Sequence, residues 1–245
     1  MLKKRIIPVL QYTDQSSIKT KNFENPRNVG NLVQYVSVFN KRQSDELCLI
    51  NLSNKFLNKS FDFDYLKEVT TYCNMPLSIG GSIDKISEIE NLLIAGTDKI
   101  ILGKSILKNS KFLKDVIKNF GSQLIIASVD INFLDNEYFL NYDKNLNYLD
   151  HIKFLQNEGV GEILINCVHK DGQMSGYDLN LIDKIYNDLE TSLLINGGAS
   201  TSKDFQNVLE IDKVQGACAS SIFLFSEETP ASIKKKLSKN IPLRN

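Results

Sequence analysis

The sequence repeats itself, and this repeat constrains the fold more than any other feature. Four pairs of segments match at nearly one offset: 45–52 with 161–168, 76–82 with 192–199, 103–106 with 220–223, and 5–12 with 124–131. Glu46 and Glu162, for example, stand 116 positions apart. Because similarity at a fixed offset marks a fold built from repeated units, we predict two similar halves, about 1–120 and about 121–245.

Each half contains four short apolar runs that have the length of a buried strand. The eight runs are 5–11, 46–52, 76–81, 99–105, 123–130, 162–167, 192–197 and 216–221. Apolar residues at helical spacing mark the segments between them, among which are 31–42, 85–96, 110–120 and 149–159. Strands that alternate with amphipathic helices predict βα units and a parallel sheet.

Eight such units in two similar halves favour an α/β fold of the (β/α)8 TIM barrel type with a twofold internal repeat. No linker rich in proline or glycine interrupts the 245 residues, so we expect a single domain over 1–245. The alternative is an open doubly wound sheet whose halves are similar by chance.

The composition excludes several classes of function. Lys and Arg number 29 and Asp and Glu also number 29, so the chain has no electrostatic bias towards nucleic acid or an anionic membrane. No run approaches the roughly 18 apolar residues of a membrane span, and the start of the chain does not read as a signal peptide. Four cysteines without a CxxC pair, and only two histidines, favour a reduced cytoplasmic protein without a metal site or a cofactor.

Two glycine doublets occupy equivalent positions at the carboxyl ends of predicted strands, where barrels of this type carry their active sites. Backbone N–H groups at such turns bind anions, so we predict two phosphate sites and a substrate with an anion at each end. The predicted contacts are Gly80, Gly81, Ser82, Gly103, Lys104, Gly197, Gly198, Ser220 and Ser221. The alternative is that the glycines only allow tight exits from the strands.

Gln11 and Asp130 form a second pair of equivalent strand ends. A carboxylate at position 130 can act as a general base or orient a substrate, whereas an amide cannot exchange a proton near neutral pH. The alternative for Asp130 is a cap on the following turn. These two positions are therefore the catalytic candidates, although one of them lacks an acid.

Two polar loops follow predicted strands at the same end. The segment 11–30 is too long for a simple connection and is predicted to be a lid, from which Lys19 could reach a phosphate. The loop 167–178 contains Asp171 and Gly172, which could add a phosphate contact. His169 in this loop could be an acid, or it could be incidental.

Charged residues open four strands at the opposite end: Arg5, Glu46, Lys99 and Glu162. They could be ordinary solvated side chains. Their placement on strands of one barrel instead predicts a floor of alternating charges that neutralise one another, and such a ring would close or gate the barrel.

Nine short motifs fall in order along the chain: KRIIPVL at 4–10, KNFEN at 21–25, DEL at 45–47, IGGSI at 79–83, GSQ at 121–123, VD at 129–130, GEIL at 161–164, DGQMSGYD at 171–178 and GGA at 197–199. With these motifs the chain resembles the cyclase subunit of imidazole glycerol phosphate synthase over nearly its whole length. The resemblance implies a barrel that receives ammonia from a glutamine amidotransferase docked at the amino-terminal face of the strands. It also implies a substrate with two phosphates, which agrees with the two doublets.

The resemblance assigns roles to several residues. It implies that Asp130 is one of two catalytic aspartates, that Lys19 is the lysine of the lid, and that the four charged residues at the strand starts form the gate on the ammonia path. The chain departs from the family at the second catalytic aspartate, which is Gln11 here, and at the strand-2 aspartate, which is Asn51. One phosphate-binding Gly-Gly-Gly is Gly80–Gly81–Ser82, and an Asn-Thr pair is Gly103–Lys104.

These departures are similar to those of divergent paralogues found with sugar-modifying clusters. In that subgroup a barrel and a glutaminase supply ammonia to a third protein, which converts an acetamido sugar to an acetamidino sugar. The loss of the acid at Gln11 and the Lys19–Thr20 pair favour this subgroup, with a phosphorylated or nucleotide-sugar substrate. The alternatives are a genuine cyclase of histidine biosynthesis and a non-catalytic channel that activates the glutaminase.

Overall fold

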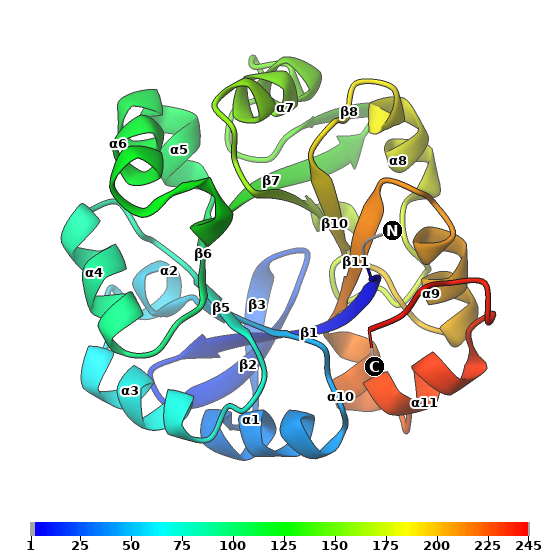
Figure 1. Ribbon diagram of the computed structural model, residues 1–245, viewed down its shortest axis with the longest axis horizontal. Helices are drawn as coiled ribbons and strands as arrows, with labels where there is room; N and C mark the ends of the chain where they lie inside the picture. The colour runs from blue at the N-terminus through cyan, green and yellow to red at the C-terminus, as the bar shows by residue number, and fades with distance from the viewer. Residues whose placement is uncertain (1–2, 245) are drawn as a thin grey trace.

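A computed structural model describes residues 3–244 and contains a closed barrel of eight parallel strands (Figure 1). The strands are β1 (Arg5–Thr13), β4 (Leu47–Asn51), β5 (Leu77–Gly80), β6 (Lys99–Leu102), β7 (Ile125–Leu134), β9 (Glu162–Cys167), β10 (Ser192–Asn196) and β11 (Val214–Ala219). Parallel pairing of β11 with β1, which sets Arg5 opposite Gly216, closes the ring. The predicted (β/α)8 barrel is confirmed, and each of the eight apolar runs overlaps one barrel strand.

The helices surround the strands as an outer layer (Figure 1). They are α1 (Leu32–Lys41), α2 (Ser53–Leu57), α3 (Phe63–Thr71), α4 (Ile86–Ile94), α5 (Lys104–Lys108), α6 (Ser110–Phe120), α7 (Tyr148–Asn157), α8 (Leu179–Tyr186), α9 (Ser202–Leu209), α10 (Ser221–Phe225) and α11 (Pro230–Lys236). Side-chain caps set several of their starts, because an asparagine or aspartate oxygen accepts a free N–H of the first turn. Asn31 caps α1 and Asp178 caps α8 in this way.

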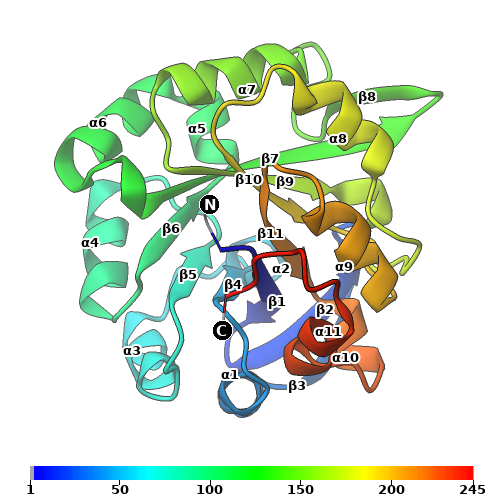
Figure 2. The same cartoon turned by 45° about the vertical axis from the view of Figure 1, so that its right-hand side comes forward.

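Two antiparallel hairpins extend the barrel, and the sequence analysis anticipated neither of them. The segment predicted to be a polar lid loop contains β2 (Ser16–Lys21) and β3 (Glu24–Asn31), which continue the sheet from β1. A shorter strand, β8 (Glu137–Leu140), pairs with the end of β7, and Figure 2 shows this hairpin projecting from the barrel. The polar segment is thus an ordered hairpin rather than a simple loop, and its turn residues Asn22 and Phe23 both adopt positive φ, as a tight two-residue hairpin requires.

Apolar side chains fill the molecule in two layers. The larger layer lies between strands and helices, and a smaller cluster fills the barrel interior. The interior cluster consists of Ile7, Val9, Cys48, Ile101, Ile126, Leu164, Leu194 and Cys218. The strands are therefore buried on both faces, which explains why they read as nearly continuous apolar runs. All four cysteines are free, and only Cys73 is partly exposed.

The two ends of the described chain meet beside the seam of the barrel, as Figures 1 and 2 show. The backbone of Lys4 accepts from the N–H of Arg244 at 3.0 Å and donates to the carbonyl of Pro242 at 2.8 Å. Its ammonium donates to the carbonyls of Ile211, Asp212 and Val214 at 2.6 to 2.9 Å. The segment before β1 is thus fastened to the turn that leads into β11. Within residues 3–244, no helix combines the length and the apolar character that crossing a bilayer requires.

Candidate active site at the carboxyl end of the barrel

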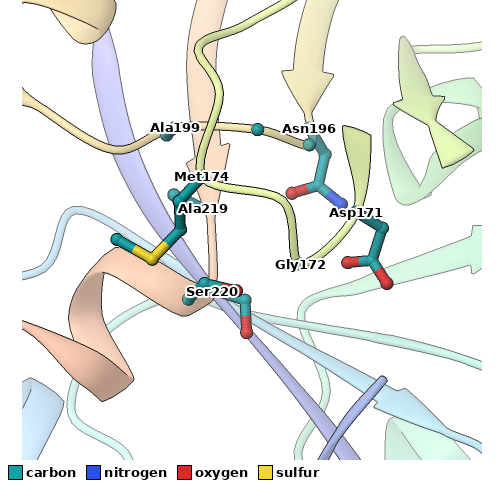
Figure 3. A pocket seen from close by; sticks show the side chains of 10 residues that line it. Asp171, Gly172, Met174, Asn196, Ala199, Ala219 and Ser220 are labelled. Carbon is teal, nitrogen blue, oxygen red and sulfur yellow. The ribbon is translucent and has the colours of Figure 1, made fainter. Parts of the chain in front are cut away.

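A pocket lies where the loops after β9, β10 and β11 converge. It is lined by Asp171, Gly172, Met174, Asn196, Gly197, Gly198, Ala199, Ala219, Ser220 and Ser221. Figure 3 shows Asp171 and Asn196 on one side of it and Met174, Ala219 and Ser220 on the other. The second glycine doublet and the serine pair that follows one strand later therefore meet in one place. We call this the second-half pocket.

Hydrogen-bond donors without partners surround the second-half pocket. The Oγ of Ser220 is buried and has no hydrogen-bond partner among residues 3–244. In the same described range, the backbone N–H groups of Gly172, Gly198 and Ala199 meet no acceptor. Because buried polar groups in folded proteins nearly always have partners, this set of donors fits an anionic ligand such as a phosphate.

Packing also requires glycine at this pocket. Gly197 and Gly198 have φ angles of +111° and +98°, which L side chains rarely adopt. A Cβ on Gly198 would lie 2.2 Å from the carbonyl oxygen of Gly176. The doublet thus serves a tight strand exit in addition to any ligand, so the glycines alone do not decide between the two interpretations. The unpartnered Ser220 hydroxyl is the observation that favours a ligand.

A second pocket lies beside Asp130, between the loops that follow β6 and β7. This pocket, which we call the Asp130 pocket, is lined by Gly103, Lys104, Leu107, Ser128, Val129, Asp130, Leu140, Tyr142 and His151. Gly80, Gly81 and Ser82 do not belong to this lining. A Cβ on Gly81 would lie 2.8 Å from the carbonyl oxygen of Asn51 and 3.1 Å from Phe61, so this doublet, like the second, serves a tight strand exit. The predicted contacts of the second half line one pocket, whereas of the first-half contacts Gly103 and Lys104 line the Asp130 pocket and the doublet does not.

Asp130 lies at the centre of a hydrogen-bonded network. Its Oδ1 accepts from Asn166 at 2.7 Å and from Ser128 at 3.1 Å, and Asn196 donates to Asn166 at 2.9 Å. Burial raises the pKa of this carboxyl group, and the hydrogen bonds from Asn166, Tyr142 and Ser128 oppose the shift. A carboxyl group with a raised pKa is suited to accept a proton during a reaction. Sequence reasoning missed Ser128, although the two-residue period of a strand places it on the same face as Asp130.

Thr20 binds the side-chain amide oxygen of Gln11. Its Oε1 accepts from the N–H of Thr20 at 3.0 Å and lies 2.9 Å from the hydroxyl of Thr20. That hydroxyl in turn lies 2.9 Å from a carboxylate oxygen of Asp171. Gln11 therefore joins β1 to the β2–β3 hairpin and, through Thr20, to the loop after β9.

Lys19 is engaged by the same loop. Its ammonium pairs with Asp171 at 2.5 Å, and both side chains are buried. Asp171 also accepts from the N–H of Phe23 at 3.3 Å, and its carbonyl accepts from Asn22 at 3.1 Å. Lys19 thus ties the β2–β3 hairpin to the loop after β9, and its contact with a phosphate stays a prediction. His169 pairs with Asp178 at 2.8 Å, at the start of α8.

The four charged residues at the strand starts meet at the opposite end of the barrel. Arg5 pairs with Glu46 at 2.9 Å and also with Glu162, which pairs with Lys99 at 2.6 Å. Arg244, which sequence reasoning missed, adds a contact to Glu46 at 3.2 Å. Burial acts against ionisation of Glu162, but Arg5 and then Lys99 outweigh it and lower the pKa of this carboxyl group. We call this set the charged floor.

Metal coordination has no visible basis in the described part of the chain. Among residues 3–244, no three histidine, cysteine, aspartate or glutamate side chains gather closely enough to hold an ion. Proton transfer, anion binding and hydrogen bonding are the chemistry that these side chains offer.

Comparison with known proteins gives full-length similarity to one group. The model of the family described as "Histidine biosynthesis protein" matches residues 5–229. The chain is 31% identical over 244 residues to "Imidazole glycerol phosphate synthase subunit HisF" of Bacteroides thetaiotaomicron, covering 97% of this chain and 96% of the relative. It is 32% identical over 246 residues to "Putative imidazole glycerol phosphate synthase subunit hisF2" of Campylobacter jejuni, with coverage of 98% and 97%. It is 30% identical over 232 residues to a "hisF3" protein of Vibrio vulnificus, with coverage of 92% and 89%.

Replacing Ser220 by alanine tests whether the second-half pocket binds phosphate. Because the hydroxyl has no partner in the folded chain, we expect the thermal midpoint to change little. Inorganic phosphate, titrated by isothermal calorimetry, should bind the variant about fivefold more weakly through loss of one hydrogen bond to a charged group. Ser226→Ala, whose hydroxyl bonds to a helix carbonyl, is the matched control. Equal affinity of Ser220→Ala and the parent would contradict the assignment.

Replacing Glu162 by glutamine tests the charged floor. The cation partners of Glu162 lower its pKa from the ordinary value of 4.5. The ionised carboxylate therefore stabilises the fold above pH 4.5, and this stabilisation is lost as the pH falls through the lowered pKa. We expect the variant to lose about 3–5 kcal/mol of unfolding free energy at neutral pH, and less in acid, measured by urea denaturation. The control Glu158→Gln breaks a more exposed pair with Lys114 and should cost under about 1 kcal/mol. A loss independent of pH would contradict this explanation.

Proposed function

The chain belongs to the histidine biosynthesis protein family and is a cyclase-like barrel of the imidazole glycerol phosphate synthase type, and from this premise we propose that it accepts ammonia from a glutamine amidotransferase partner. The partner would dock at the amino-terminal end of the strands, where the charged floor lies. Ammonia would then travel through the barrel to the carboxyl end.

The charged floor is the observation that supports this proposal most directly. Arg5 of β1 contacts Glu46, which directly precedes β4, and Glu162 of β9, so three strands are tied together across the base of the barrel. Such a floor excludes bulk water while its ion pairs remain able to separate. Beyond it, the interior side chains are apolar. Because transfer of an ion into apolar surroundings is costly, the interior would admit neutral ammonia in preference to ammonium.

We propose that the nitrogen acceptor is not the substrate of histidine biosynthesis. Gln11 stands where the family resemblance implies a catalytic aspartate, and its amide oxygen accepts hydrogen bonds from Thr20. An amide cannot supply the missing proton transfer. The acceptor we propose is an acetamido sugar that becomes an acetamidino sugar during glycan biosynthesis, with a third protein taking part. The names hisF2 and hisF3 of two relatives are consistent with such additional copies.

Asp130 favours a second candidate function, a genuine cyclase of histidine biosynthesis. Its carboxyl group keeps an ordered set of donors and has a raised pKa, as a general base would need. If Asp130 is sufficient for the proton transfers, the chain could act on the family's bisphosphorylated ribonucleotide. The third possibility, a non-catalytic channel, requires neither Asp130 nor an acid at position 11.

A cyclase assay with the family's bisphosphorylated ribonucleotide and an ammonium salt separates these candidates. We expect no product from the unmodified chain, because position 11 lacks an acid. The rate of Gln11→Asp should remain at least about a hundredfold below that of a family cyclase, which is about what general acid–base catalysis contributes. The reason is that the new carboxylate would compete with Asp171 for the single hydroxyl proton of Thr20. Gln15→Asp, the same change at an exposed position, is the control. Product from the unmodified chain would establish the cyclase and exclude the paralogue.

Co-purification tests the ammonia source. A tagged chain, isolated from its own cells, should carry an activity that converts glutamine to glutamate. Lys99→Glu places a negative charge beside Glu162 in the charged floor and should reduce the retained glutaminase activity at least about fivefold. Lys104→Glu makes the same change at the opposite end of the barrel and should retain it. Equal activity with both variants, or none with the parent, would contradict the proposed docking.

A further inference from the structure

Asp130 is the one carboxyl group among the side chains that line the Asp130 pocket. Position 11, where the family resemblance implies a second acid, holds an amide. Proton transfer at this pocket therefore depends on Asp130 and on the groups that surround it. Asn166 and Ser128 both donate to its Oδ1, at 2.7 and 3.1 Å. The second oxygen, Oδ2, is the one available to a further donor and to a ligand.

The β7–β8 hairpin brings Tyr142 beside this carboxyl group. Ile131 pairs with Leu140, and the N–H of Asn141 donates to the carbonyl of Asp130 at 2.9 Å. Tyr142 follows directly and lines the same pocket, and its phenol forms a hydrogen bond with the carboxyl group of Asp130. The backbone pairing of the hairpin therefore determines where the phenol lies.

The phenol of Tyr142 acts as a donor and not as an acid. Burial, followed by the charge of Asp130, raises the pKa of Tyr142. The phenol therefore keeps its proton at neutral pH and can share it with the ionised carboxylate. The ammonium of Lys104 lies 5.2 Å from the centre of the tyrosine ring, within the range of a cation–π contact. A positive charge on the ring polarises the O–H group and makes it a stronger donor.

The other titratable groups near Asp130 add little to this arrangement. His151 on α7 lines the pocket, but burial lowers its pKa to about 4, so the imidazole is neutral at neutral pH. Lys55 on α2 attracts the carboxylate, but its ammonium pairs with Glu24 at 3.1 Å in an exposed position, where solvent screens the charge. The phenol of the hairpin is therefore the titratable neighbour with the strongest hold on Asp130.

We propose that Tyr142 is a positioning residue for Asp130: its phenol donates to Oδ2, with Lys104 held against its ring, and keeps the carboxylate ionised and directed into the pocket. Asp130 can then accept a proton from a ligand without a second acid, which position 11 does not supply. Tyr142 keeps its own proton throughout. The inference rests on the proposed function for the reaction in which this base takes part, whereas the arrangement itself depends on neither a glutaminase nor a substrate.

Titration of the Asp130 carboxyl group tests the inference. Carbon-13 NMR of the full chain, labelled at the aspartate carboxyl carbons, follows each carboxyl group as the pH changes, and the signal that Asp130→Asn lacks is that of Asp130. Tyr142→Phe keeps the ring beside Lys104 and removes the donor. Because a hydrogen bond to the ionised form favours that form, its loss should raise the pKa of Asp130, and the titration midpoint should move up by about one pH unit.

Lys104→Gln tests the contribution of the ammonium. This change should also raise the midpoint of Asp130, but by less than Tyr142→Phe does. Its effect should be smaller still in a chain that already carries Tyr142→Phe, because the ammonium then has no phenol through which to act. Equal effects in the two chains would show that the ammonium acts on the carboxylate directly, and would overturn this part of the inference.

Tyr138→Phe is the matched control. It removes a phenol from the same hairpin, but that phenol donates to Asp178 at 3.0 and 3.1 Å and not to Asp130. The midpoint of Asp130 should therefore stay at its value in the parent. Each phenylalanine variant removes a single oxygen from a side chain that is not fully buried, so we expect the fold to be retained, and circular dichroism checks this.

Two results would overturn the inference. One is a midpoint of Asp130 that is unchanged or lower in Tyr142→Phe. The other is an equal rise in Tyr138→Phe, because the cause would then be a loosened hairpin and not the lost phenol. Neither result bears on the ammonia source: the midpoint can rise as expected when no glutaminase co-purifies with the chain, and it can stay unchanged when one does.

Discussion

The parallel pairing of β11 with β1 is the constraint on which the rest of the structure depends. Once these strands pair, every barrel strand has two neighbours and its inward side chains meet those of all the others. Closure also brings all the strand starts to one end and all the carboxyl ends to the other. Glu46 and Glu162, although 116 positions apart, thereby contact the same arginine, Arg5. The charged floor and the two pockets are therefore consequences of a single topological event.

Sequence reasoning succeeded where the information was periodic. The constant offset and the apolar runs predicted all eight barrel strands, because a strand buried on both faces must be apolar over most of its length. It failed at the β2–β3 hairpin, since Asn22–Phe23 is not a common turn pair and the strand residues that follow are polar and exposed. It predicted a phosphate site in each half because the repeat includes both glycine doublets. Tyr142, which lines the pocket beside Asp130, lies in a connection outside the repeat, and a strand alignment gives no sign of it.

The structure also explains how position 11 can hold an amide. Gln11 and Asp171 both lie 2.9 Å from the hydroxyl of Thr20, which has one proton to share. The amide oxygen carries no charge and also accepts the backbone N–H of Thr20, so it can occupy this place beside the ionised Asp171. A carboxylate at position 11 would be repelled by Asp171, although Lys19 would moderate the repulsion. The residue that the family resemblance associates with proton transfer thus serves to fasten a hairpin over the mouth.

A chain of hydrogen bonds connects the second-half pocket to the Asp130 pocket. Asn196 lines the second-half pocket and donates to Asn166, which donates in turn to Asp130. Each amide in this chain is oriented by its neighbour, so its carbonyl and its NH₂ cannot exchange places without losing a bond. A phosphate held beside Asn196 would therefore contact one end of an ordered hydrogen-bond network whose other end is the carboxylate of Asp130. The spacing of β7, β9 and β10, three adjacent strands of a closed barrel, would then fix the distance between such a phosphate and Asp130.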